Sequence, residues 1–347
     1  MGKTILRDSG PAMSVIIATD HYETIRQTIG HLVAQSGRER LELVIVTSSE
    51  KDLGLNQQEI AGFCRVEVVE VASIFPLSLS TAAGIRRASA PLVVFAESHA
   101  FPAAGWAETL IEAHRDQSCV AVGAVIGNAN PGILSWANLF VDYGRCVEPS
   151  AAKNVTYPPG HHTAYKRDAL LEYDSQLEAV MDSEILLHWD MRAKGHRLRL
   201  EPAARIFHVN ISSLTAWLPE RYHSGRRFAS TRGRQWPLLK RLLYAGGSPL
   251  IPVVRLPRVC GDLLASTFPR AQWPLILPAI VVGLLASALG EAAGYLFGAG
   301  DSTEQAGRME LFKMKYLTGR DRRKLQAWYL NVARQTESLS GVGVRRG

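Results

Sequence analysis

The chain has 347 residues, of which 47% are hydrophobic and 20% charged. This composition can bury a sizeable core and excludes global disorder, and the length corresponds to two units or to one domain with an appendage. The net charge of +7 is unevenly spread, because residues 1–220 hold 19 basic and 25 acidic residues, whereas residues 221–272 hold 10 basic and one acidic.

Short runs rich in Val and Ile recur through the first half of the chain. They predict strands at residues 13–18, 41–46, 66–72, 91–97 and 119–127. Helical spacing between these runs predicts helices at residues 21–36, 78–89 and 103–116. Continuous apolar strands that alternate with helices indicate an α/β fold with a mostly parallel sheet covered on both faces.

In such a sheet, ligands bind beyond the carboxyl ends of the strands. The candidate positions are therefore Thr19 with Asp20, residues 47–50, and residues 97–99. No GxGxxG follows the first strand and no GxxxxGK[ST] occurs, so neither a Rossmann dinucleotide site nor a P-loop is predicted.

The order of these segments resembles that of the inverting family 2 glycosyltransferases, which have the GT-A fold. The resemblance covers about residues 12–210 and is carried by SVIIATDHYETIRQTI, LELVIVTSSEKD, STAAGIRRASAPLVVFAESHAFPAAGW, GHHTAYKRDALLE and DSEILLHWDMRAKGHRLRLEPAARIFHVN. It implies a nucleotide-sugar donor, and an acceptor that is a saccharide or a polyprenyl-linked molecule.

Glu97 and His99 stand where the family has the Asp-x-Asp motif that holds a divalent cation on the donor diphosphate. Carboxylate and imidazole both bind Mn²⁺, whereas Mg²⁺ prefers all-oxygen ligands, so Mn²⁺ is expected over Mg²⁺. The resemblance also implies His208 as a residue near the metal. Glu97 and His99 could instead be a surface pair at the end of a strand that binds no metal. His208 could instead be a buried histidine of the core.

Glu184 is the candidate general base, because the family places this carboxylate at the start of a helix about eleven positions before a glycine, here Gly195. Inverting transfer needs a carboxylate that takes the proton of the acceptor hydroxyl. Asp182 takes this role if the helix begins earlier. The alternative is that both acids only favour the helix N-terminus through its dipole.

The donor is expected against Ala18 and Thr19, at the end of the first strand. Glu50 is a candidate nucleotide contact in a turn that lacks the carboxylates the family usually has there, so uracil recognition is only an expectation. In membrane-bound relatives a basic segment closes over the donor pyrophosphate, and the matching residues are Arg221, Arg226 and Arg227. Binding of lipid headgroups is the competing role for these arginines.

His161 and His162 follow a stiff Pro-Pro-Gly turn and are expected at the acceptor side of the pocket. Neighbouring side chains on an extended chain point apart, so the pair is not expected to bind a metal together. A purely structural turn is the alternative.

Residues 273–290 are eighteen consecutive uncharged residues, close to the minimum for a membrane-spanning helix. The preceding basic segment, residues 221–272, has the pattern of an amphipathic region that meets anionic lipid headgroups. A true span and a re-entrant or surface-lying segment both fit this pattern. A buried core helix of a soluble protein is the remaining alternative.

The four cysteines, at positions 64, 119, 146 and 260, show no CxxC spacing, which suits a reducing compartment. The N-terminal residues contain no apolar run long enough for a signal peptide. The catalytic part is therefore expected to face the cytoplasm while the protein is associated with an anionic membrane.

We thus expect a GT-A-like domain at 1–220, a basic amphipathic interfacial region at 221–272, an apolar transmembrane or re-entrant segment at 273–300, and a basic helical tail at 301–347. The expected activity is metal-assisted, inverting sugar transfer. A non-catalytic GT-A-like scaffold recruited to the membrane is the alternative. A nucleic-acid partner is not expected, because no motif that reads DNA or RNA occurs and such binding would not explain the apolar run.

Overall fold

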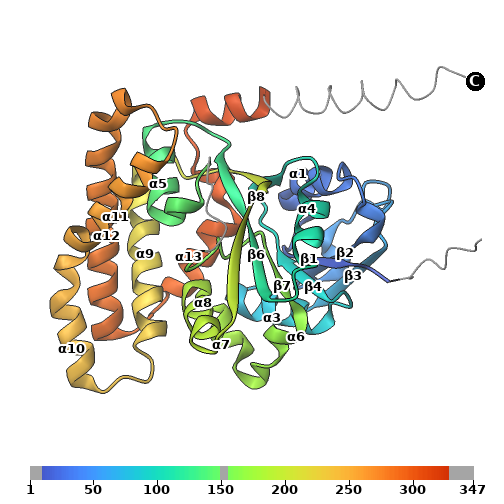
Figure 1. The fold of residues 1–347 in the computed structure, drawn as a ribbon, viewed down its shortest axis with the longest axis horizontal. Coiled ribbons are helices and arrows are strands. Elements are labelled where there is room, and N and C mark those ends of the chain that lie inside the picture. The colour runs from blue at the N-terminus through green and yellow to red at the C-terminus, as the bar shows by residue number, and fades with distance from the viewer. Residues whose placement is uncertain (1–9, 149–154, 328–347) are drawn as a thin grey trace, which may run out of the picture. The chain divides into compact units, whose positions relative to one another are not determined.

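The computed structural model describes residues 10–148 and 155–327. The chain divides into two compact units, Met1–Val125 with Pro149–Ile206, and Ile126–Glu148 with Phe207–Gly347. Figure 1 shows the helices and strands along the chain.

The first unit is built from strands and short helices, and two of its strands, β6 and β8, run a few residues past its boundary. Its elements are β1 (Met13–Ala18), α1 (Tyr22–Val33), β2 (Leu41–Thr47), α2 (Glu50–Leu53), β3 (Arg65–Glu70), α3 (Leu77–Arg87), β4 (Leu92–Phe95), β5 (Ala100–Pro102), α4 (Trp106–Ala113), β6 (Cys119–Asn128), β7 (Thr163–Lys166), α6 (Arg167–Leu171), α7 (Leu177–Met181), α8 (Glu184–Ala193) and β8 (Arg197–His208).

Eight strands form one mixed sheet in the order β3-β2-β1-β4-β7-β6-β8-β5. Strands β3, β2, β1 and β4 are parallel to one another, whereas β7 runs antiparallel to both β4 and β6. The predicted α/β class with a mostly parallel sheet is confirmed, and each of the five predicted strands is present. Strands β5 and β7 are too short to give a signal in the sequence.

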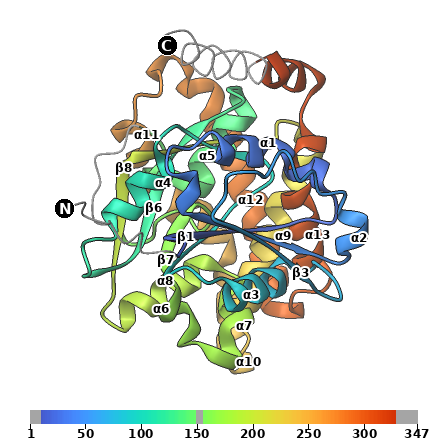
Figure 2. The same cartoon turned by 90° about the vertical axis from the view of Figure 1, so that its right-hand side faces the viewer.

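The central strands are buried because helices cover both faces of the sheet. Every residue of β2 and β4 is buried, as expected for parallel strands with Val- and Ile-rich sequences. Figure 2 shows α1 and α4 on one side of the sheet and α3, α6 and α7 on the other. The three predicted helices are thus confirmed as α1, α3 and α4, each somewhat shorter than expected.

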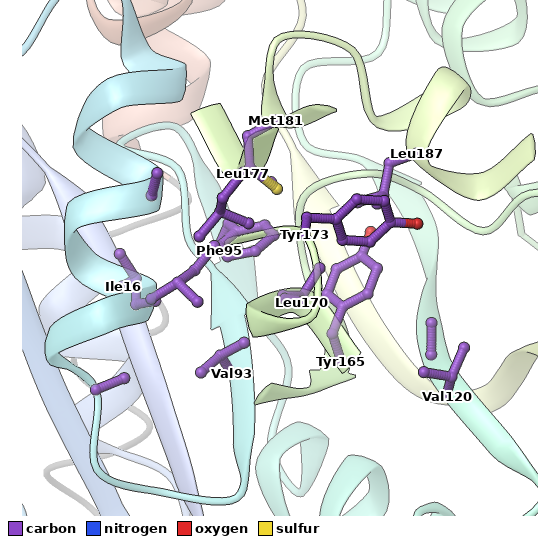
Figure 3. Packing of buried hydrophobic residues seen from close by; sticks show 14 of the residues in the cluster. Ile16, Val93, Phe95, Val120, Tyr165, Leu170, Tyr173, Leu177, Met181 and Leu187 are labelled. Carbon is purple, nitrogen blue, oxygen red and sulfur yellow. The ribbon is translucent and has the colours of Figure 1, made fainter. Parts of the chain in front are cut away.

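One core cluster lies directly beneath the carboxyl ends of β1 and β4. Ile16, Val93 and Phe95 from the sheet pack there with Tyr165 and with Leu187 of α8 (Figure 3). The same apolar cluster therefore supports the ends of the strands and the helix that carries Glu184.

The second unit is helical. Its elements are α5 (Ile133–Tyr143), α9 (Leu214–Arg232), α10 (Leu238–Gly247), α11 (Ile251–Ala265), α12 (Trp273–Phe297), α13 (Ser302–Leu311) and a 3₁₀ helix, Lys313–Tyr316. Helix α12 packs against α5, α9, α10 and α11. Residues 319–327 are also helical, with exposed cations at 320 and 322–324; the rest of the predicted tail, residues 328–347, lies outside the described residues.

The apolar run predicted from the sequence is the first part of α12. Within the described part of the chain, one helical stretch, Arg270–Phe297, is long and apolar enough to cross a membrane by length and composition. In that stretch, 44% of the most apolar window is buried inside the fold. A core helix of a soluble protein would pass the same test, so this finding is a weak indication of membrane contact.

Candidate active site

Hydrogen bonds between Ser48 and Asp20 join the loops that follow β1 and β2. Because the two strands are parallel, both end at the same edge of the sheet. The backbone N–H and the hydroxyl of Ser48 donate to one carboxylate oxygen of Asp20, at 3.0 and 2.6 Å. Thr19 is buried and donates to the carbonyl of His21 at 2.8 Å, while Ala18 is half-buried and Glu50 is exposed at the start of α2.

Glu97 lies just beyond β4, and the antiparallel strand β7 brings His161 to it. The register of the two strands pairs Val94 with Ala164, and continuing it by three residues puts His161 opposite Glu97. The side chains meet there, with His161 Nδ1 at 3.3 Å from Glu97 Oε1. The hydroxyl of Thr28 in α1 donates to the Glu97 carbonyl at 2.8 Å, which holds the backbone at this position.

His162 contacts the same carboxylate as His161, with 3.3 Å between its Nε2 and Glu97 Oε2. The expectation that these neighbouring side chains point apart is therefore wrong. Its premise was an extended chain, but φ at His162 is 59°, in the left-handed region that non-glycine residues seldom adopt. Burial lowers the pKa of the His162 imidazole despite the nearby Glu97 carboxylate, which favours a neutral ring with a nitrogen lone pair.

The donor set around Glu97 suits a divalent cation of borderline softness. His99 Nε2 lies 3.7 Å from Glu97 Oε1, and both side chains are buried. His161 and His162 contact the same carboxylate, so three imidazoles lie within 3.7 Å of Glu97. Carboxylate with imidazole is a ligand combination of Mn²⁺ and Zn²⁺, whereas Mg²⁺ favours oxygen ligands alone.

Glu184 is the first residue of α8 and points toward the same cluster. The helix begins there, after the N-cap residue Ser183, as predicted, and Asp182 is left as the last residue of the preceding turn. His161 Nδ1 lies 3.5 Å from Glu184 Oε1, so one imidazole contacts both Glu97 and Glu184. The Glu184 side chain is partly exposed, which leaves it accessible to a substrate.

Gly160 allows Glu184 to approach the loop before β7. A Cβ atom at position 160 would lie 2.6 Å from Glu184 Cγ and 2.7 Å from its Cβ. The hydroxyl of Tyr165 donates to the Gly160 carbonyl at 3.1 Å and also contacts His188 Nε2 of α8 at 2.7 Å. Burial, together with the Glu184 charge, raises the pKa of Tyr165 well above its ordinary value, so this hydroxyl keeps its proton and ties the loop to the helix.

His208 belongs to the second unit, where its orientation is set by two neighbours. Asn210 Oδ1 can only accept, so Nδ1 of His208 donates this hydrogen bond at 2.9 Å. The lone pair then resides on Nε2, which faces the Tyr143 hydroxyl at 3.2 Å and Lys313 Nζ at 3.5 Å. The carboxylate of Glu310 lies near enough to contribute a metal ligand together with this nitrogen.

The predicted arginines of α9 also belong to the second unit, and their surroundings differ. The Arg221 side chain is buried and bonds the carboxylates of Asp142 and Glu220. This ion-pair network gives Arg221 a structural role in place of the predicted pyrophosphate contact. Arg226 is half-buried and donates to the Gly298 carbonyl at 2.9 Å, and Arg227 is half-buried.

Several residues of this site carry no local signal in the sequence. Thr28, Gly160 and Tyr165 act through contacts between segments distant along the chain. Strand β7 itself, Thr163–Lys166, is only four residues long, so the sequence gives no periodic signal for it.

Three solved structures resemble the backbone of this chain. S. aureus TarS 1–349 in complex with UDP matches at 15% identity and a TM-score of 0.44, over 81% of this chain and 90% of that chain. Mannosyltransferase PcManGT from Pyrobaculum calidifontis in complex with GDP-Man and Mn²⁺ matches at 17% identity and a TM-score of 0.41, over 94% of this chain and 87% of that chain. GalNAc-T7 with UDP, GalNAc and Mn²⁺ matches at 15% identity and a TM-score of 0.44, over 57% of this chain and 43% of the length of GalNAc-T7. No curated protein sequence matches the chain significantly.

The mixed, mostly parallel sheet flanked by helices is GT-A-like, as the resemblance implied. Residues 14–174 match the family model described as Glycosyl transferase family 2. This match over residues 14–174 confirms the class of enzyme predicted from the sequence, a glycosyltransferase.

Proposed function

We propose that this protein is an inverting glycosyltransferase that moves a sugar from a nucleotide-diphosphate donor to a lipid-linked or polysaccharide acceptor. The observation that carries the proposal is the placement of Glu184. Its carboxylate opens α8, is partly exposed, and shares His161 with the buried Glu97 at 3.5 and 3.3 Å. The imidazole of His161 thus contacts both the candidate base, Glu184, and the candidate cation ligand, Glu97.

We propose the following reaction at this site. The acceptor hydroxyl oxygen forms a bond to the anomeric carbon while Glu184 takes its proton. The bond between the anomeric carbon and the diphosphate oxygen breaks, and its electron pair leaves on that oxygen. Attack from the face opposite the leaving group inverts the anomeric configuration, and no covalent sugar–enzyme bond is needed.

Glu97 and His99 are the proposed cation ligands, with His208 as a further ligand suggested by the family resemblance. A bound divalent cation would neutralise charge on the departing nucleoside diphosphate. A ligand set that includes the imidazole of His99 beside the carboxylate of Glu97 supports Mn²⁺ over Mg²⁺.

Donor and acceptor contacts are proposed on the same basis. Ala18 and Thr19 would line the donor at the end of β1, and Glu50 would contact the nucleotide. Arg226 and Arg227 would contact the pyrophosphate. His161 and His162 would also border the acceptor.

We further propose that the protein acts at an anionic membrane with its catalytic domain in the cytoplasm. The long apolar helix α12 and the basic segment 221–272 support the first part. All four cysteines are free thiols, one of them exposed, which supports a reducing compartment.

The test is transfer or hydrolysis with a panel of nucleotide-sugars, followed by comparison of Glu184→Gln with Asp182→Asn. Glu184→Gln should lower kcat by about 10²–10⁴-fold, since it removes the general base. Donor binding, measured by isothermal titration with Mn²⁺, should stay within about twofold in both variants, and Asp182→Asn should keep most of the activity. Wild-type turnover in Glu184→Gln, or loss of turnover only in Asp182→Asn, contradicts the assignment.

A further inference from the structure

Helix α10 of the second unit exposes a leucine-rich face. Leu238, Leu239, Leu242 and Leu243 are each between 47% and 80% exposed. Residues four apart lie on the same side of a helix, so the two pairs form one stripe. Four exposed leucines on a ten-residue helix are more than scattered surface hydrophobics, and they mark an interaction surface.

Helices α11 and α12 also expose apolar side chains, and α12 packs against both α10 and α11. On α11, Val253, Val254 and Leu264 are 58–69% exposed. On α12, five residues that are 40–68% exposed lie three, four or seven positions apart, so they form one stripe on the same side of the helix: Leu275, Val282, Leu285, Leu289 and Leu296. Figure 1 shows the three helices along one side of the helical unit.

The opposite side of α12 is pressed directly onto α9. A Cβ atom on Gly290 would lie 2.0 Å from the Tyr222 carbonyl oxygen, and one on Gly294 would lie 2.4 Å from that of Arg226. At these distances the two backbones are in contact, and neither lipid nor water fits between them. The Arg232 guanidinium also donates to the hydroxyl of Tyr295 at 3.2 Å.

This contact decides between a span and a surface-lying helix. A 25-residue helix is about 37 Å long, enough to cross a hydrocarbon layer of about 30 Å. If α12 stood upright across that layer, α9 would have to enter it as well. The charged residues of α9 are among the least favourable in hydrocarbon: Glu220, Arg221, Arg226, Arg227 and Arg232.

Cations accompany the exposed apolar stripes. Lys240 on α10, Arg258 on α11 and Arg270 before α12 are exposed, and Lys240 lies over the Trp236 ring at 4.0 Å from its centroid. Asp262 is the one acidic residue between positions 221 and 272. Apolar side chains flanked by cations and an aromatic ring match the interfacial zone of a bilayer with anionic headgroups.

We propose that α10, α11 and α12 form a docking face that lies flat on an anionic lipid bilayer, and that α12 does not span it. The face consists of the exposed residues of these helices named above. The proposal rests on the membrane association proposed in the preceding subsection and is independent of the transfer reaction.

Flotation with lipid vesicles tests the docking face. The full-length protein should float with vesicles of phosphatidylcholine and phosphatidylglycerol, and much less with phosphatidylcholine alone. The double variant Leu239→Glu/Leu243→Glu should lower the bound fraction at least about tenfold, since it removes two buried apolar contacts and adds two negative charges. The control is Leu79→Glu, at a leucine of α3 in the other unit that is 46% exposed, and this variant should float like the wild type.

Two further measurements separate this proposal from its rivals. Nucleotide binding should be unchanged in the double variant, and its loss together with flotation would mean general misfolding. A wild-type protein that binds no vesicles, or a dimer that the double variant converts to a monomer without any vesicle binding, overturns the docking face.

Cysteine labelling tests the orientation of α12. In a Cys64→Ser/Cys260→Ser background, single cysteines replace Arg270 and Asp301, two exposed residues that flank the helix. In sealed membrane vesicles both positions should react with an impermeant maleimide to the same extent, because both lie on one side of the bilayer. Reaction at one position with protection of the other would show a span and would overturn the proposal.

Discussion

The substitution Gly160→Ala probes the position of Glu184 without altering any charge or ligand. The new Cβ would lie 2.6–2.8 Å from three carbons of Glu184, whereas ordinary contacts begin at about 3.4 Å. The loop and α8 must therefore separate by roughly 0.7–1 Å. A rotamer change cannot remove the overlap, because one of the three atoms is Glu184 Cβ, which is fixed to the helix backbone.

A shift of about 1 Å in a catalytic group can reduce turnover by about 10²-fold, so kcat should fall by one to two orders of magnitude. The overlap should lower the free energy of unfolding by about 1–3 kcal/mol, which leaves the protein folded at 25 °C if its stability is ordinary. Steady-state kinetics with the best donor from the panel, together with urea unfolding, measures both effects. The KM for the donor should change little.

Gly30→Ala is the matched control, since Gly30 lies in α1 and a methyl group added there would meet nothing within 4 Å. It should keep full activity and gain up to about 1 kcal/mol of stability. If folded Gly160→Ala retains kcat within about twofold, the position of Glu184 does not limit the reaction and its assignment as the base is wrong.

Three other outcomes are expected. Glu97→Ala should weaken Mn²⁺ binding, followed by electron paramagnetic resonance, by at least about tenfold, because it removes the carboxylate shared by the three imidazoles of the donor set; unchanged affinity would place the cation elsewhere. Burial lowers the pKa of His114 to about 4 and that of His188 to about 3, so the unfolded chain binds more protons below pH 6.5. Stability should fall by about 4 kcal/mol between pH 7 and 5 on this account, and urea unfolding that is flat over this range would refute it. Gly290→Ala should destabilise the second unit by about 3 kcal/mol or more, since a backbone carbonyl of α9 must move, whereas Gly246→Ala, with nothing within 4 Å, should not, as thermal unfolding would reveal.

Features that depend on neighbours in sequence were predictable. The Val- and Ile-rich strands follow from local composition, and their boundaries differ from the predicted ones by no more than two residues. The start of α8 at Glu184 was implied by the family resemblance, and the uncharged residues 273–290 form the first part of α12. Each of these signals lies within one helix or one strand, where propensity and periodicity act directly.

The histidine pair shows where such reasoning ends. An extended chain would separate the side chains of His161 and His162, but the left-handed backbone at His162 and the antiparallel pairing of β7 with β4 turn both toward Glu97. That pairing joins residues about 70 positions apart, so no local pattern reports it. The hydrogen-bond partners of Arg221 and Arg226 are likewise not revealed by the sequence.

The sequence by itself thus determined the α/β class, five of the strands and three of the helices in their order along the chain, and the class of enzyme, and it named the candidate base and metal ligands that remain predictions. Only the tertiary structure decided which of these residues touch, and which face of the apolar helix is covered. The physical reason is that a strand or helix is specified by its own periodicity, whereas a site depends on register and close packing between segments. The backbone contact of Gly290 with α9 is an example, because it makes a helix with the composition of a membrane span part of a packed, charged bundle.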